Sequence, residues 1–259
     1  MPLKVLEAHR NLADTLKQIA HGSRLPLERE RTAYLAGHLG FAVPYADSLT
    51  TACDLQLVLD SAEQLKATGQ NNEARQKVAA EAVPLWLKLA AQVRETMIIY
   101  QSIVGNRGDL GQLASMHDKY VRLALFRLPL SIEEYIGYIP FEMSEALEQT
   151  LKPPNDAARG IFIPTCPSML RSGEQFRILV VATGTGAVEE ISVHTRFKKE
   201  SSWQQVTPHL KGRRTYGVSI GPFDVNQHFA EYYASAQIEG KTYVTPATAP
   251  YSGHAVTLF

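Results

Sequence analysis

The sequence predicts an α+β protein of two domains: an N-terminal helical bundle over residues 1–154 and an immunoglobulin-like β-sandwich over residues 155–259. Three observations predict this division. Apolar residues recur every three or four positions from residue 3 to about residue 150, which is the period of amphipathic helices. Beyond residue 160 they alternate with a period of two, which is typical of strands. Between the two regions, "LKPPNDAARG" has the prolines and glycine of a linker.

The first two helical segments are predicted over residues 5–20 and 30–69. The first has one apolar stripe, formed by Val5, Leu12, Leu16 and Ile19. In the second, Pro44 should break or kink the helix and Gly69 should end it.

A third helical segment is predicted over residues 71–108. Asn71 or Asn72 would cap its start, Pro84 would bend it, and Gly105 and Gly108 would end it. A fourth segment follows over residues 109–128.

Two sequence signals near residue 130 predict a helix end followed by a new helix start. Pro129 should terminate the fourth helix. "SIEE", residues 131–134, has the capping-box form S-x-x-E, so a further short helix should begin at Ser131.

Strands are predicted at close spacing in the second half, over residues 160–165, 174–184, 188–197, 202–208, 214–220, 229–238, 241–246 and 254–259. "TGTGA" between the second and third of these has the form of a hairpin turn. Along 188–197, Ile191, Val193, Thr195 and Phe197 should face one side of a sheet, and Ser192, His194 and Arg196 the other. Seven or eight short strands in about 100 residues favour an immunoglobulin-like sandwich.

The composition limits the classes of partner. The chain has 26 basic and 26 acidic residues, so we expect neither nucleic acid nor an anionic membrane as a partner. No apolar run approaches the roughly 20 residues of a membrane helix. Cys53 and Cys166 are the two cysteines, which excludes a disulfide framework. The opening residues form no signal peptide, so a complete chain would be cytoplasmic, and a piece of a longer exported protein would be secreted or on the cell surface.

No motif predicts a catalytic residue, a metal site or a cofactor. The histidines show no ligand spacing, and the glycines of "TGTGAVEE" lack the third glycine and the helix of a dinucleotide-binding loop. His117 and Asp118 are adjacent, so a helix would point them in different directions, and a solvated surface is the simpler interpretation. Glu133 and Glu134 are explained as charges at a helix start.

Aromatic residues of the second half give the one candidate binding site; they are Trp203, Tyr216, Tyr232, Tyr233, Tyr243 and Tyr251. Exposed aromatic faces suit the apolar faces of sugar rings, and a cation or histidine can bind the hydroxyls. Tyr232 and Tyr233 must point to opposite faces of one strand, so one of them faces away from the core. The predicted glycan-binding residues are Trp203, Tyr216, Tyr233 and Arg196.

Several segments together resemble a known group of proteins: "LPLERERTAYLAGHLGFAVPYADSL", "VGNRGDLGQLASMHDKY", "PSMLRSGEQFRILVV", and the terminal "YYASAQIEG" with "VTPATAP". Their order is similar to the C-terminal portion of large bacterial glycoside-hydrolase-like proteins, in which this portion follows a catalytic (β/α) barrel. The chain itself has no alternating strand and helix series for a barrel, and no position matches that family's catalytic acids.

The resemblance implies a non-catalytic accessory module that braces a catalytic domain outside this chain or helps to hold a neutral glycan. Bracing predicts an exposed apolar patch on the N-terminal helices. The alternative is a stand-alone hydrolase with its site in a crevice between the two domains, built from His117, Asp118 or Glu134 and loops of the sandwich.

Overall fold

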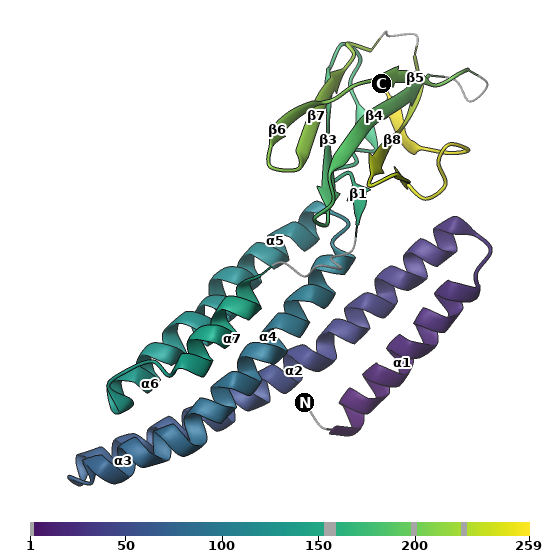
Figure 1. The fold of residues 1–259 in the computed structure, drawn as a ribbon. Helices are drawn as coiled ribbons and strands as arrows, with labels where there is room; N and C mark the ends of the chain where they lie inside the picture. The colour runs from purple at the N-terminus through teal and green to yellow at the C-terminus, as the bar shows by residue number, and fades with distance from the viewer. Residues whose placement is uncertain (1–2, 153–158, 198–200, 224–226) are drawn as a thin grey trace. The chain divides into compact units, whose positions relative to one another are not determined.

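A computed structural model describes residues 3–152, 159–197, 201–223 and 227–259 of the chain. Helices precede strands along the sequence, as predicted (Figure 1). The chain divides into two compact units: Met1–Ile19, Thr32–Ile103 and Gly111–Pro154 form one, and Ala20–Arg31, Val104–Leu110 and Asn155–Phe259 form the other. The predicted boundary between residues 154 and 155 lies outside the described residues and stays a prediction.

The helical elements include three π-helical turns, labelled η. In chain order the elements are α1 (Leu3–Gly22), α2 (Pro26–Ala67), α3 (Asn71–Lys77), η1 (Val78–Ala82), α4 (Val83–Ile103), α5 (Arg107–Met116), η2 (His117–Val121), η3 (Leu123–Arg127), α6 (Leu128–Ile136) and α7 (Phe141–Leu151).

Helix α2 runs without a break through Pro44, which is buried, so the predicted break is wrong, and the kink that was the other expected outcome stays a prediction. The predicted end at Gly69 is confirmed. Gly69 has φ 81°, the left-handed conformation that glycine adopts without strain. The amide of Gln70 then donates to the Leu65 carbonyl at 2.9 Å, which satisfies one of the last carbonyls of the helix.

The predicted asparagine cap is wrong. The N-cap of α3 is Gln70, and no side chain caps the helix, while Asn71 and Asn72 lie inside its first turn. Further on, η1 ends at Ala82, and Pro84 follows as the second residue of α4. Proline has no N–H and its ring crowds the carbonyl one turn earlier, so a widened π turn accommodates it.

Pro129 does not end a helix, and no new helix begins at Ser131, so both predictions are wrong. Helix α6 begins at Leu128 and continues directly from η3, with Pro129 in its first turn. Proline is tolerated there because the first N–H groups of a helix have no intrahelical acceptor. Ser131 and Glu134 therefore lie inside α6, not at its cap.

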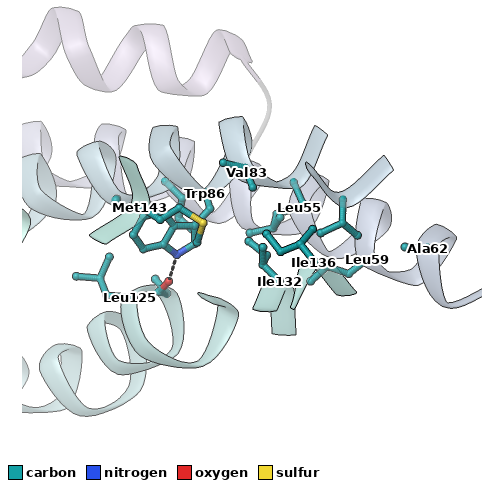
Figure 2. Close-up of a cluster of buried hydrophobic side chains, with 14 of the residues drawn as sticks. Leu55, Leu59, Ala62, Val83, Trp86, Leu125, Ile132, Ile136 and Met143 are labelled. Carbon is teal, nitrogen blue, oxygen red and sulfur yellow. Dashed lines mark hydrogen bonds between the residues drawn. The ribbon is translucent and has the colours of Figure 1, made fainter. Parts of the chain in front are cut away.

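Trp86 is the centre of the helical core (Figure 2). Its indole is fully buried, and its Nε1 donates to the carbonyl oxygen of Ala124 at 2.8 Å. Ala124 belongs to η3, where the π-helical turn alters the usual backbone ladder. Leu125 and Met143 lie near the indole, and Ile132 belongs to the same core, so the core links α4 to α6, α7 and η3.

Two sheets follow the helices. The strands are β1 (Gly160–Phe162), β2 (Met169–Leu170), β3 (Phe176–Thr183), β4 (Val188–Arg196), β5 (Gln204–Val206), β6 (His209–Gly212), β7 (Thr215–Ile220), β8 (Phe229–Ile238), β9 (Lys241–Thr245) and β10 (His254–Leu258). Every predicted strand contains one of these, and the prediction missed only the short β2 and β6. One sheet has the order β1-β3-β7-β6, and the six-stranded sheet has the order β2-β10-β8-β4-β5, with β9 also paired to β8.

The inner faces of both sheets share one core, to which Ile178 and Val180 of β3 contribute from one sheet and Val193 and Tyr232 from the other. The "TGTGA" segment is not a hairpin turn, because β3 pairs with β1 and β7 whereas β4 pairs with β5 and β8. It connects the two sheets instead. The guanidinium of Arg214 holds this connection by donating to the carbonyls of Ala182, Thr183 and Gly186.

Helix α1 buries a different face from the one its sequence predicts as the apolar stripe. Its buried residues are Leu6, Ala13 and Ala20, and an added Cβ at Gly40 of α2 would lie 3.9 Å from Ala13 Cβ. Val5, Leu12 and Ile19 are exposed, and Leu16 is half-buried. Helix α1 therefore exposes Val5, Leu12 and Ile19, and the expected apolar patch on the N-terminal helices stays a prediction.

None of the helices in the described ranges has the length and apolar character that crossing a membrane requires.

Candidate functional site

The candidate site lies on the face of the six-stranded sheet that points away from the shared core. Strand alternation places His194 and Arg196 of β4 on this face, as predicted, and Glu231 and Tyr233 of β8 beside them. The register sets His194 directly opposite Tyr233 and Arg196 directly opposite Glu231. Trp203, just before β5, covers them. These residues are called the outer-face cluster below.

The aromatic rings of the cluster contact one another. The imidazole of His194 stacks on the Tyr233 ring with 4.3 Å between centroids and 8° between planes. The Trp203 indole meets the Tyr233 ring nearly at a right angle, 88°, with centroids 4.7 Å apart. The Arg196 guanidinium carbon lies 4.2 Å from the centroid of the Trp203 ring, within the range of a cation–π interaction.

A buried ion pair anchors the cluster. Arg196 Nε donates to Glu231 Oε2 at 2.6 Å, and the two residues are 8% and 6% exposed. Arg196 Nη2 also donates to the backbone carbonyl of Tyr251 at 3.0 Å, and Trp203 Nε1 donates to that of Pro250 at 3.1 Å. Because the two charges neutralise each other, the ion pair gives this face no net charge.

His194 and Tyr233 of the cluster favour their neutral forms. Burial lowers the pKa of His194 below its ordinary value of 6.5, while Glu190 acts weakly in the opposite direction. His194 Nε2 lies 2.9 Å from Ser235 Oγ. Burial raises the pKa of Tyr233. At neutral pH the cluster therefore offers hydrogen bonds and aromatic surface, with no activated proton donor or nucleophile among its members.

The structure brings together three of the four predicted glycan-binding residues: Arg196, Trp203 and Tyr233. Tyr216 is separate, because it lies on β7 in the other sheet and packs against the core. Tyr232 is the core tyrosine and Tyr233 faces away from the core, as the alternation requires. However, Tyr233 is only 8% exposed, since His194 and Trp203 cover its ring.

Tyr251 was not among the predicted glycan-binding residues, although it is an aromatic residue of this region. It lies between β9 and β10 and is 89% exposed, the most exposed of the large hydrophobic side chains described. The available signal was its place outside the predicted strands, directly after Pro250 in a segment rich in proline and threonine.

The polar residues of the alternative hydrolase hypothesis lie on helix surfaces. His117 and Asp118 are exposed on η2, and Asp118 Oδ1 pairs with Arg122 Nη1 at 3.5 Å, one turn away. Glu134 is exposed on α6. Within the described ranges, no three histidine, cysteine or acidic side chains come close enough to hold a metal ion. Both cysteines are free thiols.

No family model matches this sequence, and no curated protein is similar to it. Among solved structures, the chain is similar to the endo-β-1,4-mannanase from Thermotoga petrophila, at 10% sequence identity and a TM-score of 0.32. The similarity covers 46% of this chain and 23% of the mannanase chain. A similarity of this size supports no conclusion about fold or activity.

Proposed function

We propose that this chain is a non-catalytic accessory module of a carbohydrate-active, glycoside-hydrolase-like protein, and that α1 and α2 pack against a catalytic domain outside the chain. The link to carbohydrate rests on the sequence resemblance described above. The observation that carries the packing role is the exposed apolar stripe of α1, where Val5, Leu12 and Ile19 are 40%, 50% and 53% exposed.

The two apolar faces of α1 support this role. Leu6, Ala13 and Ala20 recur every seven residues and are buried, and the exposed residues recur at the same interval one position earlier. A surface helix of a monomer needs only one apolar face, so a second one suits a partner. Burying the remaining half of three such side chains would contribute about 2 to 4 kcal/mol.

We further propose that the strand region is an immunoglobulin-like sandwich. The orders β1-β3-β7-β6 and β2-β10-β8-β4-β5 support this, because they match strands A-B-E-D and A′-G-F-C-C′ of that fold. β9 and β10 pair with successive parts of β8, like one interrupted G strand. The expected NMR result is backbone NOEs between the paired strands β3 and β7, with no backbone NOEs between β3 and β4. NOEs along a β3–β4 hairpin would contradict it.

The mass of the native polypeptide tests the module proposal. An antibody raised against this chain should detect a band far larger than the 28.7 kDa of the chain in the cells that produce it. A band near that mass would refute the proposal, because no catalytic domain would then be attached.

Substitutions on α1 test the packing role within the larger polypeptide. Leu12→Glu should lower its thermal stability and open it to protease, whereas Gln18→Glu, an exposed polar position on the same helix, should not. In the isolated chain neither substitution should change the melting temperature, since both side chains are already exposed. Equal behaviour of the two variants in the larger polypeptide would place the packing surface elsewhere.

A further inference from the structure

The segment between β9 and β10, residues 246–252, has a folded backbone. Ala249 N donates to Pro246 O at 3.0 Å, and Tyr251 N and Ser252 N both donate to Thr248 O, at 3.0 and 3.2 Å. These bonds make consecutive turns, so the segment satisfies much of its own backbone hydrogen bonding. It is called the 246–252 loop below, and its place between β9 and β10 can be followed in yellow in Figure 1.

The outer-face cluster fixes this loop from one side. Arg196 and Trp203 bind the carbonyls of Tyr251 and Pro250, the two successive residues at the exposed end of the loop. At the base, Gly253 passes so close to β8 that a Cβ there would lie 2.4 Å from the backbone oxygen of Tyr232. The backbone that carries Tyr251 is therefore held at Pro250, Tyr251 and Gly253.

The side chain of Tyr251 is exposed to solvent, although its backbone is held by hydrogen bonds. It is 89% exposed, while Tyr233 of the same face is 8% exposed. An exposed aromatic ring on a fixed backbone needs little ordering when a ligand binds, which favours affinity. The half-exposed indole of Trp203 is bonded to the neighbouring Pro250, so a second aromatic group lies next to this position.

We propose that Tyr251, with the exposed part of Trp203 beside it, is a stacking site for a sugar ring of a neutral polysaccharide. This proposal rests on the carbohydrate-related function proposed above and names its ligand class and site. Two features favour a neutral ligand. The charges of the Arg196–Glu231 pair neutralise each other, and residues 246–252 carry no charged side chain. Flat aromatic rings match the apolar faces of pyranose rings.

Affinity electrophoresis of the full chain tests the site, with galactomannan, xyloglucan, mixed-linkage β-glucan or laminarin in the gel. At least one of these polymers should retard the wild-type chain. Tyr251→Ala should weaken that retardation about tenfold, whereas Tyr251→Phe should retain it, because stacking uses the ring and not the hydroxyl. Tyr138→Ala is the matched control, since Tyr138 is also an exposed tyrosine, at 57%, but lies after α6.

The outcomes separate this proposal from the accessory function. Tyr251→Ala should melt at the wild-type temperature, because its side chain makes no buried contact. Equal retardation of Tyr251→Ala and wild type would overturn the site and leave glycan binding in place. Retardation by none of the four polymers would overturn the proposal even if the native polypeptide is larger than this chain. A native band near 28.7 kDa would refute the accessory function by itself.

Discussion

Replacing Arg196 with methionine should strongly destabilise the strand region, because the buried carboxylate of Glu231 would lose its countercharge. Methionine retains much of the apolar stem but removes the guanidinium that binds Glu231 Oε2 at 2.6 Å. Glu231 is 6% exposed, so its carboxylate would remain buried without its countercharge. Removing one partner of a buried pair costs about 3 to 5 kcal/mol.

The double variant Arg196→Met with Glu231→Gln should recover most of this loss. A buried ion pair contributes little compared with neutral groups of the same size, because desolvation offsets the attraction between the charges. A residual loss of about 1 to 3 kcal/mol is expected from the missing hydrogen bond to the Tyr251 carbonyl and the missing cation–π contact with Trp203.

Thermal unfolding followed by circular dichroism measures these changes. For a unit of about 100 residues, 3 kcal/mol corresponds to a melting temperature about 12 to 24 °C lower. Hydrogen exchange of peptides from β8 should show that the loss lies in the strand region. The control is Arg122→Met, which removes an exposed pair with Asp118 and should cost less than about 1 kcal/mol. The role of the buried pair would be contradicted if Arg196→Met were as stable as that control, or if the double variant were no more stable than Arg196→Met.

Three further predictions concern single residues. Trp86→Phe removes the donor to the Ala124 carbonyl and leaves a small cavity, so urea unfolding should show a free energy of unfolding lower by about 2 to 4 kcal/mol. A decrease below about 0.5 kcal/mol would contradict the role of this hydrogen bond. Gly253→Ala places a Cβ 2.4 Å from a backbone oxygen of β8 and should cost about 1 to 3 kcal/mol, whereas Gly212→Ala, whose Cβ meets nothing within 4 Å, should stay within about 1 kcal/mol of wild type. Burial lowers the pKa of His254, so below about pH 6.5 the unfolded state binds more protons than the folded state. The contribution of His254 to the free energy of unfolding should therefore be constant above that pH and fall as the pH falls toward 5. His254→Gln should reduce this slope in urea titrations and leave the contribution of His194, whose pKa burial also lowers; an unchanged slope would exclude His254 as a source.

Local sequence signals located the elements better than their ends and connections. The period of two identified the segments of β3, β4 and β8 because each strand buries one face against a core. Pro129 and Ser131 have the residue types of a helix end and a helix start, yet the chain continues through both. Packing of the adjoining segments around Trp86 outweighs a local cap of about 1 kcal/mol.

The "TGTGA" segment illustrates a different limit. Its residues favour a turn, and the backbone bends at residues 184–186 between β3 and β4. Whether the flanking strands pair with each other or separate into two sheets depends on β7 and β8, which lie far along the chain. Arg214, which holds this connection, also comes from outside the segment.

The order of helices and strands could be read from the amino-acid sequence alone, and so could the alternation that places His194 and Arg196 on one face and Tyr232 and Tyr233 on opposite faces. This alternation follows from the fixed side-chain geometry of a single strand. Which aromatic rings remain exposed could not be predicted in this way. Exposure depends on neighbours from other strands: the register stacks His194 on Tyr233, and the Arg196–Glu231 pair fixes the loop from which Tyr251 projects into solvent.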